Sequence, residues 1–436
     1  MTLLKAVRGT RDLLPPETEL WNHVESTARR VFARYNFGEI RTPIFEDTQL
    51  FARGVGEETD IVSKEMYTWE DRARAQSEKS QSLTLRPENT AGVVRAYIEH
   101  KLGETGLLQK LYYIGPQFRR ERPQKGRYRQ FWQIGAEVIG PPSAGSESPL
   151  RDAEVLEMLA SFLDELGIAG WTLVLNSVGS STDRPRYVAA LREALKERAP
   201  LMCVDCQRRA ETNPLRVLDC KVPEDQPIIE TLPRIADYLD DESKAHFVQV
   251  LASLDACGVQ YEVNPRLVRG LDYYTRTTFE FTHGGLGAQN ALLGGGRYDG
   301  LSEMLGGPKA PGIGFAMGLD RLVLTLQAQA DASPEKSAPV VADAFIAPLT
   351  EGLNAAALGL ARELRRQGLR IELGDGSFRL RKSFEIGNKL ARNIVLLGED
   401  EQASGILTVK NFATGEQTKI PRGEVAQTLS STSEKW

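Results

Sequence analysis

Hydrophobic and polar positions alternate with different periods along this chain and predict a mixture of helices and strands. Apolar residues recur at helical spacing from about Glu17 to Tyr35, which predicts an amphipathic helix. Residues 112–140, YYIGPQFRRERPQKGRYRQFWQIGAEVIG, predict a strand, a loop and a returning strand. Further helices are predicted over residues 150–167, 186–198 and 230–250.

Several shorter patterns predict extended structure. The run EIRTPIFED is interrupted by Pro43, which cannot donate to a ladder, so this strand is expected at an edge or an interface. The run LVRGLDYYTRTTFEF predicts a long strand, in which Thr277, Phe279 and Phe281 alternate against polar neighbours. The three consecutive glycines of ALLGGGRYDGL predict close approach of a ligand to the backbone, a β-bulge, or both. The segment PGIGFAMGLDRLVLTL predicts a glycine-rich strand and then a helix beginning near Leu319.

Composition divides the chain into domains. The segment AQADASPEKSAP has the composition of a linker, and strand, helix and strand patterns alternate after it, which predicts an α/β domain with some parallel pairing. We therefore expect a first domain over residues 1–327, a helical insertion within it over 183–262, a linker over 328–340 and a second domain over 341–436.

Charge and apolar content limit the environment of the protein. The chain has 436 residues and a net charge of −5, so no global basic field attracts nucleic acid, and any such contact must use local patches. There is no apolar leader at the N-terminus and no apolar run of bilayer length. We expect a cytoplasmic protein with no membrane partner.

The four cysteines offer one CxxC, formed by Cys203 and Cys206. Cys220 and Cys257 do not form a second one, and zinc sites normally show paired ligands, so reduced thiols are favoured over a zinc site and no metal is expected. The four histidines form no HExxH or comparable cluster.

The loop of the predicted hairpin carries an unusual concentration of cations. Glu121 is the only acid among Arg119, Arg120, Arg122, Lys125, Arg127 and Arg129. A solvated edge that blocks aggregation is one interpretation. The excess of arginine favours another, because a guanidinium makes bidentate contacts with phosphate that an ammonium group cannot make. The chain has no GxxxxGK[ST] loop and no dinucleotide GxGxxG after a strand, so these arginines would have to hold a nucleotide.

This hairpin resembles motif 2 of the class II aminoacyl-tRNA synthetases, in the form found in the histidyl-tRNA synthetase family. The helix followed by EIRTPIFED resembles motif 1, PGIGFAMGLDRL resembles motif 3, and LVRGLDYY resembles the sequence peculiar to this family. TLRPENTA also matches, with Asn89 where glycine is usual. The resemblance implies an α+β catalytic domain with a mixed, mainly antiparallel sheet, a helical insertion and a C-terminal α/β anticodon-binding domain.

The resemblance also implies an activity, namely ATP-dependent activation of L-histidine and its transfer to histidine tRNA by a homodimer. ATP would enter with Mg²⁺ as its substrate complex, and no prosthetic group is implied. By motif match, Arg269 and Arg119 would be catalytic, and Arg119, Arg321 and Glu121 would bind ATP. Gln124 and Arg122 would bind tRNA. The histidine-binding residues would be Glu88, Thr90, Arg119, Arg127, Gln133, Glu137, Arg269, Tyr273, Tyr274 and Tyr298.

Two alternatives remain within this resemblance. A non-catalytic relative serves as the regulatory subunit of ATP phosphoribosyltransferase, but such relatives lack the anticodon-binding domain and have a degraded LVRGLDYY segment, whereas this chain has both. The other alternative is a class IIa synthetase for a different amino acid. Amino-acid-dependent exchange of pyrophosphate with ATP separates these functions.

Overall fold

The chain forms two compact units, Met1–Lys336 and Ser337–Trp436, and each is described by itself. The computed structural model describes residues 3–56, 59–71, 80–124, 126–271, 273–286, 290–332 and 342–431. Within these residues, no helix combines the length and the apolar character needed to cross a bilayer.

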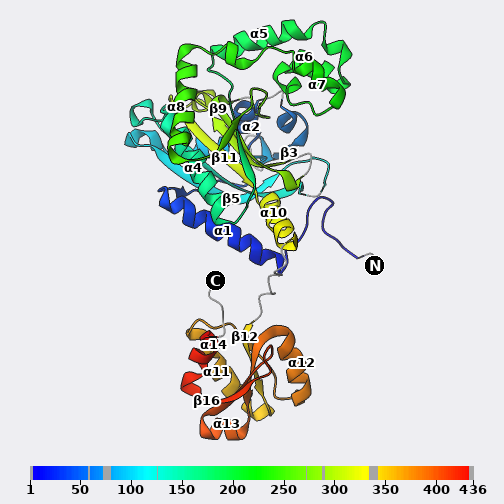
Figure 1. Ribbon diagram of the computed structural model, residues 1–436, viewed down its shortest axis with the longest axis vertical. Coiled ribbons are helices and arrows are strands. Elements are labelled where there is room, and N and C mark those ends of the chain that lie inside the picture. Colours follow the sequence, from blue (N-terminus) through cyan, green and yellow to red (C-terminus); the bar gives the residue numbers. More distant parts are fainter. Residues whose placement is uncertain are drawn as a thin grey trace. The chain divides into compact units, whose positions relative to one another are not determined.

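An eight-stranded sheet forms the centre of the first unit (Figure 1). The outermost pairs, β1–β5 and β7–β8, are parallel, and all pairs between them are antiparallel, which confirms the predicted mixed, mainly antiparallel sheet. In spatial order the strands are β1 (Gly38–Glu39), β5 (Gln109–Phe118), β6 (Gln130–Ile139), β11 (Gly312–Gly318), β10 (Ala291–Arg297), β9 (Thr275–His283), β7 (Trp171–Ser177) and β8 (Tyr261–Val263).

Helices cover one face of this sheet and form the main core with it. Phe279 and Phe315 of the sheet belong to one buried cluster with Phe32 and Phe162 of the helices. The helices are α1 (Glu17–Arg34), α4 (Pro149–Glu165), α8 (Asp241–Cys257) and α10 (Leu319–Ala332), and Figure 1 shows α1, α4 and α10 along the sheet. The predicted helices at 17–35 and 150–167 correspond closely to α1 and α4.

The segment around Pro43 forms edges, as predicted. β1 lies at the end of the large sheet, and β2 (Phe45–Asp47) lies at the end of a three-stranded sheet with β4 (Gln81–Leu85) and β3 (Tyr67–Asp71). Next to this small sheet are α2 (Thr48–Val55), a π-helical turn (Ile61–Glu65) and α3 (Thr90–Glu99). Residues 72–79 lie outside the described residues.

The insertion has a small core of its own, which extends from Tyr187 to Leu239. Its helices are α5 (Asp183–Leu195), α6 (Val204–Thr212) and α7 (Gln226–Ile229). The predicted helix over 230–250 is wrong in its first half: Pro233 lies in that half, and Asp240 caps a new helix by accepting from the Ser243 N–H at 2.7 Å. That helix, α8, packs in the main core. The buried core of the insertion itself therefore ends at Leu239, before the end of the predicted insertion at residue 262.

The predicted long strand over LVRGLDYYTRTTFEF is also only half right. β9 begins at Thr275, and the preceding segment is a loop in which Asp272 lies outside the described residues. The side-chain amide of Asn176 donates to the carbonyls of Pro265 and Leu267, at 3.3 and 2.9 Å. Hydrogen bonds from Asn176 thus satisfy these carbonyls, so they do not need a partner strand. The loop places the Arg269 guanidinium next to Gly294 of β10.

The second unit is an α/β sandwich, as predicted. Its five strands lie in the order β13 (Ile371–Leu373), β12 (Ala342–Pro348), β14 (Ala391–Leu397), β15 (Ile406–Asn411) and β16 (Gln417–Pro421). The first three are parallel neighbours, and β16 was not predicted. α11 (Asn354–Arg366) and α14 (Val425–Ser431) pack on one face, and α12 (Leu380–Leu390) packs on the other. A short α13 (Glu399–Ser404) precedes β15.

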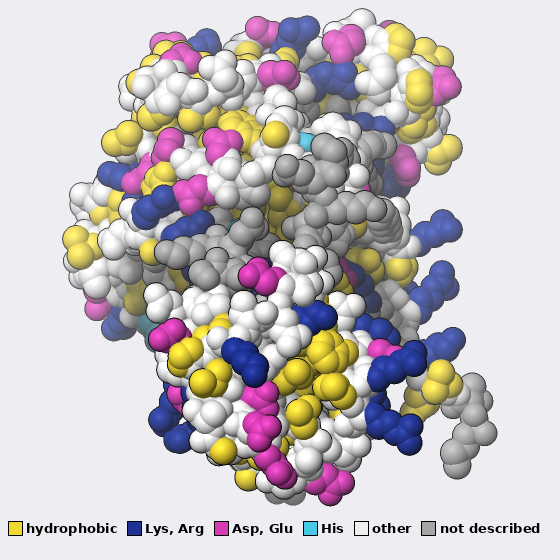
Figure 2. Space-filling model, turned by 60° about the horizontal axis from the view of Figure 1, so that its bottom comes forward, with side chains coloured by type: hydrophobic (Ala, Val, Ile, Leu, Met, Phe, Trp, Pro, Cys, Tyr) yellow, Lys and Arg dark blue, Asp and Glu magenta, His cyan; other side chains and the backbone are white. Residues whose placement is uncertain are grey.

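α10 continues to Ala332, so the first residues of the predicted linker are helical, and its remainder lies outside the described residues. On the face shown in Figure 2, cationic and acidic side chains are interspersed, in keeping with the modest net charge.

The buried ion pair of Arg297 and Asp152 yields a stability prediction. Both side chains are 0% exposed, and Arg297 also donates to the Ser146 carbonyl at 2.8 Å. Asp152→Ala leaves a buried guanidinium without its main counter-charge, so we expect a loss of about 3–5 kcal/mol in the free energy of unfolding. Denaturant titration measures it. Glu193→Ala, which removes an exposed partner of Lys196, is the control and should change little; equal effects of the two substitutions would contradict the prediction.

Candidate active site

A cavity of about 980 Å³ opens over the face of the large sheet opposite the helices and extends toward the insertion. Every residue predicted to bind ATP or histidine lines it: Glu88, Thr90, Arg119, Glu121, Arg127, Gln133, Glu137, Arg269, Tyr273, Tyr274, Tyr298 and Arg321. The predicted tRNA-binding residues Arg122 and Gln124 are not among its lining residues; Gln124 pairs with Arg127 at the tip of the hairpin. Arg119, Arg269 and Arg321, which are up to 202 residues apart in the sequence, therefore share one cavity.

Each of these arginines is held by a contact with a neighbouring element. Arg119 follows the end of β5, donates from Nε to the Pro87 carbonyl at 2.9 Å, and lies over the ring of Phe131 at 5.2 Å. Arg321, in the first turn of α10 as predicted, donates to the Ala291 carbonyl at 2.7 Å. Arg269 forms an ion pair with Glu280 of β9. These contacts restrict the rotamers of the guanidinium groups before any ligand is present.

Glu137 is the most deeply buried acid of the cavity. Its side chain is 0% exposed, and its two oxygens accept from the hydroxyls of Thr90 and Tyr298, each at 2.7 Å. Burial disfavours the charged form and raises the pKa of Glu137 to about 8, although the two hydroxyls act in the opposite direction. The carboxylate has no cationic side chain among its hydrogen-bond partners in the described chain.

Glu88 caps α3. Its carboxylate accepts from the backbone N–H groups of Thr90 and Ala91, at 2.7 and 3.0 Å, so this acid, which directly precedes the N-cap residue, stabilises the N-terminus of the helix. Burial raises the pKa of Glu88. Asn89 has an ordinary φ of −119°, and its side chain accepts from the Thr42 hydroxyl. The replacement of the usual glycine therefore needs no special backbone freedom here.

Glycines under the cavity make room for its large side chains. A Cβ on Gly314 would lie 1.7 Å from Glu137 Oε2, and one on Gly294 would lie 2.7 Å from the Arg269 guanidinium. The register explains both contacts, because Gly314 pairs with Glu137, and Gly294 pairs with Glu280, the partner of Arg269. The predicted close approach to the three consecutive glycines is thus made by the protein's own side chains, and the predicted bulge also occurs, between Gly296 and Arg297.

Three polar atoms of the cavity have no hydrogen-bond partner within the described residues: Tyr113 Oη, Gln133 Oε1 and Arg269 Nε. They belong to side chains that line the cavity. Since buried polar groups are almost always hydrogen-bonded, these atoms are polar groups in the wall of the cavity that the described residues leave unsatisfied.

Sequence reasoning missed several residues of the cavity. Glu280 is one of the polar neighbours of Phe279 and Phe281, so the alternation of β9 already indicated that it faces away from the core. Glu65, whose pKa is raised by burial, and Tyr113 carried no comparable signal. Arg209 and Arg216 reach the cavity from the insertion, and neither was among the predicted site residues.

Known proteins are similar to this chain over nearly its whole length. A family described as histidyl-tRNA synthetase matches residues 9–322, and an anticodon binding domain matches residues 343–432. A histidine–tRNA ligase of Koribacter versatilis is 72% identical over 97% of this chain and 95% of its own, and one of Solibacter usitatus is 57% identical over 99% and 100%. The crystal structure of apo histidyl-tRNA synthetase from S. aureus is 37% identical, with a TM-score of 0.78 over 98% of this chain and 100% of its own.

The raised pKa of Glu137 predicts how stability depends on pH. Because its pKa is about 8 in the folded state and ordinarily near 4.5, the folded protein binds more protons than the unfolded chain between these values. The free energy of unfolding should therefore fall as pH rises through this window. Glu137→Gln cannot titrate and should flatten that fall, which denaturant titrations between about pH 5 and pH 8 measure. Parallel pH profiles of the two proteins would contradict the assignment.

Proposed function

The chain belongs to the histidyl-tRNA synthetase family, and we propose that the cavity over its large sheet carries out the histidine–tRNA ligase reaction. The carboxylate of histidine attacks the α-phosphate of ATP and forms histidyl-adenylate and pyrophosphate, and the terminal ribose of histidine tRNA then attacks the acyl carbon. The observation that carries the proposal is that Arg119, Arg269 and Arg321 share one cavity with the buried Glu137.

The arginines supply the charge stabilisation of the first step. Arg119, fixed between Pro87 and Phe131, would hold the α-phosphate together with the substrate carboxylate, and Arg269 would reach the α-phosphate from the opposite wall. Arg321 would hold the γ-phosphate. Such pre-positioned donors stabilise charge as it develops on the phosphoryl oxygens. Glu121, which pairs with Arg127 at 3.2 Å, would bind ATP together with these arginines.

Glu137 would recognise the imidazole ring. Its oxygens already accept from two hydroxyls, and a carboxylate has room for about four hydrogen bonds, so an imidazole N–H can be added. Tyr274 and Tyr298 would enclose the ring. An amino acid with an apolar side chain would leave this acid buried and without that partner, which favours histidine.

The remaining polar groups would hold the backbone atoms of the substrate. Glu88, whose charged form is disfavoured by burial, gains a counter-charge from the α-ammonium group. Gln133, Thr90 and Tyr273 also line the cavity, and Thr90 and Gln133 would bind the α-amino and carboxylate groups with Glu88. Arg127 would orient the carboxylate.

The tRNA would meet both units. Arg122 and Gln124 lie on the hairpin loop between β5 and β6, from which the acceptor end can approach the cavity. In the second unit, Arg379, Arg381, Lys382 and Lys389 are exposed on or next to α12 and provide the local basic patch that the modest net charge requires. The four cysteines are free, which agrees with a reducing compartment, and we propose the cytoplasm as the location.

Exchange of pyrophosphate with ATP tests the proposal. With histidine the exchange should be rapid, and with each of the other standard amino acids it should be slow. Arg269→Ala should lower the histidine-dependent rate about 10²–10³-fold, because it removes a positive charge at the reacting phosphate.

The matched control is Arg381→Ala, because this arginine is 92% exposed in the second unit and the exchange does not involve tRNA. It should exchange at the wild-type rate. Absence of exchange with histidine would favour the regulatory-subunit alternative, and exchange with another amino acid would favour a different class IIa synthetase.

We also propose that the chain forms a homodimer through the small three-stranded sheet. Phe45 and Trp69 contact each other on its surface, with tilted rings whose centroids are 6.1 Å apart and with exposures of 53% and 40%, and the neighbouring Ile44 is also exposed. Contiguous exposed apolar side chains indicate an interaction surface. Light scattering should give the mass of a dimer, and Phe45→Asp should shift it toward that of a monomer. Leu201→Asp, at an exposed position of the insertion, should leave it unchanged; a monomeric wild-type protein would refute the proposal.

A further inference from the structure

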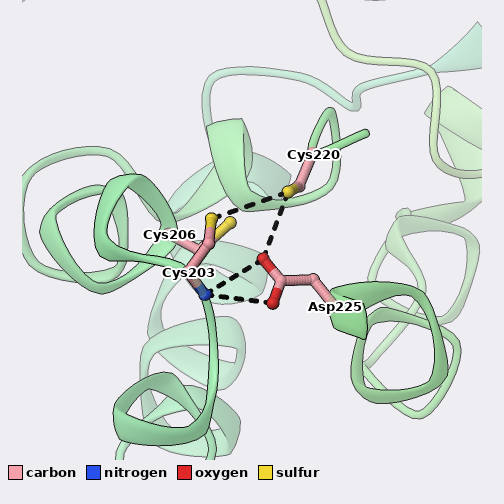
Figure 3. A group of neighbouring side chains, drawn as sticks. All are labelled: Cys203, Cys206, Cys220 and Asp225. Atoms are coloured by element: carbon pink, nitrogen blue, oxygen red, sulfur yellow. Dashed lines mark hydrogen bonds between the residues drawn. The ribbon is translucent and has the colours of Figure 1, made fainter. Parts of the chain in front are cut away.

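Three cysteines and one aspartate of the insertion converge outside the predicted set of site residues. Cys203 and Cys206 lie at the start of α6, Cys220 follows a 3₁₀ turn (Pro214–Val217), and Asp225 ends another (Pro223–Asp225). Their four ligand atoms lie within 4.8 Å of one another, and Figure 3 shows them directed toward a common centre. The fourth cysteine, Cys257, is exposed on α8 and takes no part.

The spacing of these atoms is that of a tetrahedral metal site. With metal–sulfur bonds of about 2.3 Å, tetrahedral sulfur atoms are about 3.8 Å apart. The Sγ atoms of Cys203 and Cys220 are 3.9 Å apart, and Cys220 Sγ lies 3.2 Å from Asp225 Oδ2. The widest pairs are no more than 4.8 Å apart, so contraction by at most about 1 Å would bring all four atoms to bonding distance of one ion.

Asp225 lacks the counter-charge that a buried carboxylate needs. It is 1% exposed, and within the described residues no lysine, arginine or histidine forms an ion pair with it. Its hydrogen bonds come from the Cys203 N–H, at 3.0 and 3.3 Å, and from the Cys220 thiol. A cation at the centre of the cluster would supply the missing charge, and soft sulfur ligands combined with a carboxylate suit zinc.

We infer that Cys203, Cys206, Cys220 and Asp225 bind one Zn²⁺ as a structural site. All four positions of the ion are then filled by side chains, so it holds the fold and leaves no position for a substrate. The expectation of reduced thiols without a metal rested on the absence of a second CxxC. The chain folds Cys220 and Asp225 into the place of that second pair, at a spacing of C-x₂-C-x₁₃-C-x₄-D.

The ion would fix the wall of the insertion that faces the cavity. Arg209 and Arg216 lie between the second and third ligands in the sequence, and both line the cavity. Arg216 Nη1 lies so near the backbone beside Arg269 that a Cβ on Gly270 would be only 2.8 Å from it. A zinc ion that joins α6 to the segment after Cys220 would therefore hold two cations at the edge of the cavity.

Metal analysis of the purified full-length protein tests the inference. After growth with added zinc and extensive dialysis, the wild-type protein and Cys257→Ser should each retain about one zinc per chain. Cys220→Ser and Asp225→Asn should each bind zinc at least about 10–100-fold more weakly, since even outer residues of metal sites have effects of that size. Competition with a coloured chelator measures the affinities, and circular dichroism checks that the variants are folded.

Cobalt substitution supplies a readout that is independent of folding and activity. Co²⁺ added to the metal-free wild-type protein should give an absorption band from thiolate-to-metal charge transfer. This band should be weaker in Cys220→Ser, which removes one of three thiolates, and unchanged in Cys257→Ser. Wild-type protein that retains no zinc and shows no such band would overturn the inference. So would a disulfide between Cys203 and Cys220 found by mass spectrometry in the freshly purified protein. Neither result bears on pyrophosphate exchange, so the two proposals stand or fall separately.

Discussion

The active-site cavity depends on one packing constraint: each large polar side chain that lies on the sheet needs a neighbouring backbone without a Cβ. Glu137 lies over Gly314, Arg269 over Gly294 and Tyr274 over Gly296, as the positions of a built Cβ show. Tyr113 and Tyr298 lie in the same way over Gly135 and Gly312. The sheet can therefore accommodate a carboxylate, a guanidinium and phenol rings in one layer while its opposite face remains a close-packed apolar core.

The sequence of β11, GIGFAMG, has small residues at alternate positions, as this constraint requires. Ile313, Phe315 and Met317 are buried in the main core, and the alternate positions, which face the cavity, are glycine or alanine. A period of two was therefore present in the sequence, with small residues where a half-buried strand usually has polar ones. We predicted a glycine-rich strand there, but only the register with β6 shows that Gly314 accommodates Glu137.

Sequence reasoning succeeded where chemistry and local structure are encoded in one continuous segment. The cation-rich hairpin, the α1 helix and the end strands around Pro43 were recognised because period, turn residues and proline act locally. It failed where a distant side chain decides the local structure. The loop before β9 was predicted as strand because its pattern is strand-like, and Asn176, about 90 residues earlier, satisfies its carbonyls instead. Asp225 also lies next to three thiols, and the spacing of the cysteines in the sequence did not predict this cluster.

The charges of the cavity explain why its two substrates belong together. Burial raises the pKa of Glu88 and Glu137 and lowers that of Arg119 and Arg321. Without a ligand, the charged forms of both the acids and the arginines are therefore destabilised. A ligand with charge of one sign stabilises only the acids or only the arginines. In the proposed reaction, histidine presents an ammonium group and a ring N–H to the acids, while its carboxylate and the triphosphate face the arginines. Each substrate then restores the charged state of the groups that hold it, and the free energy gained in binding favours the geometry in which the carboxylate meets the α-phosphate.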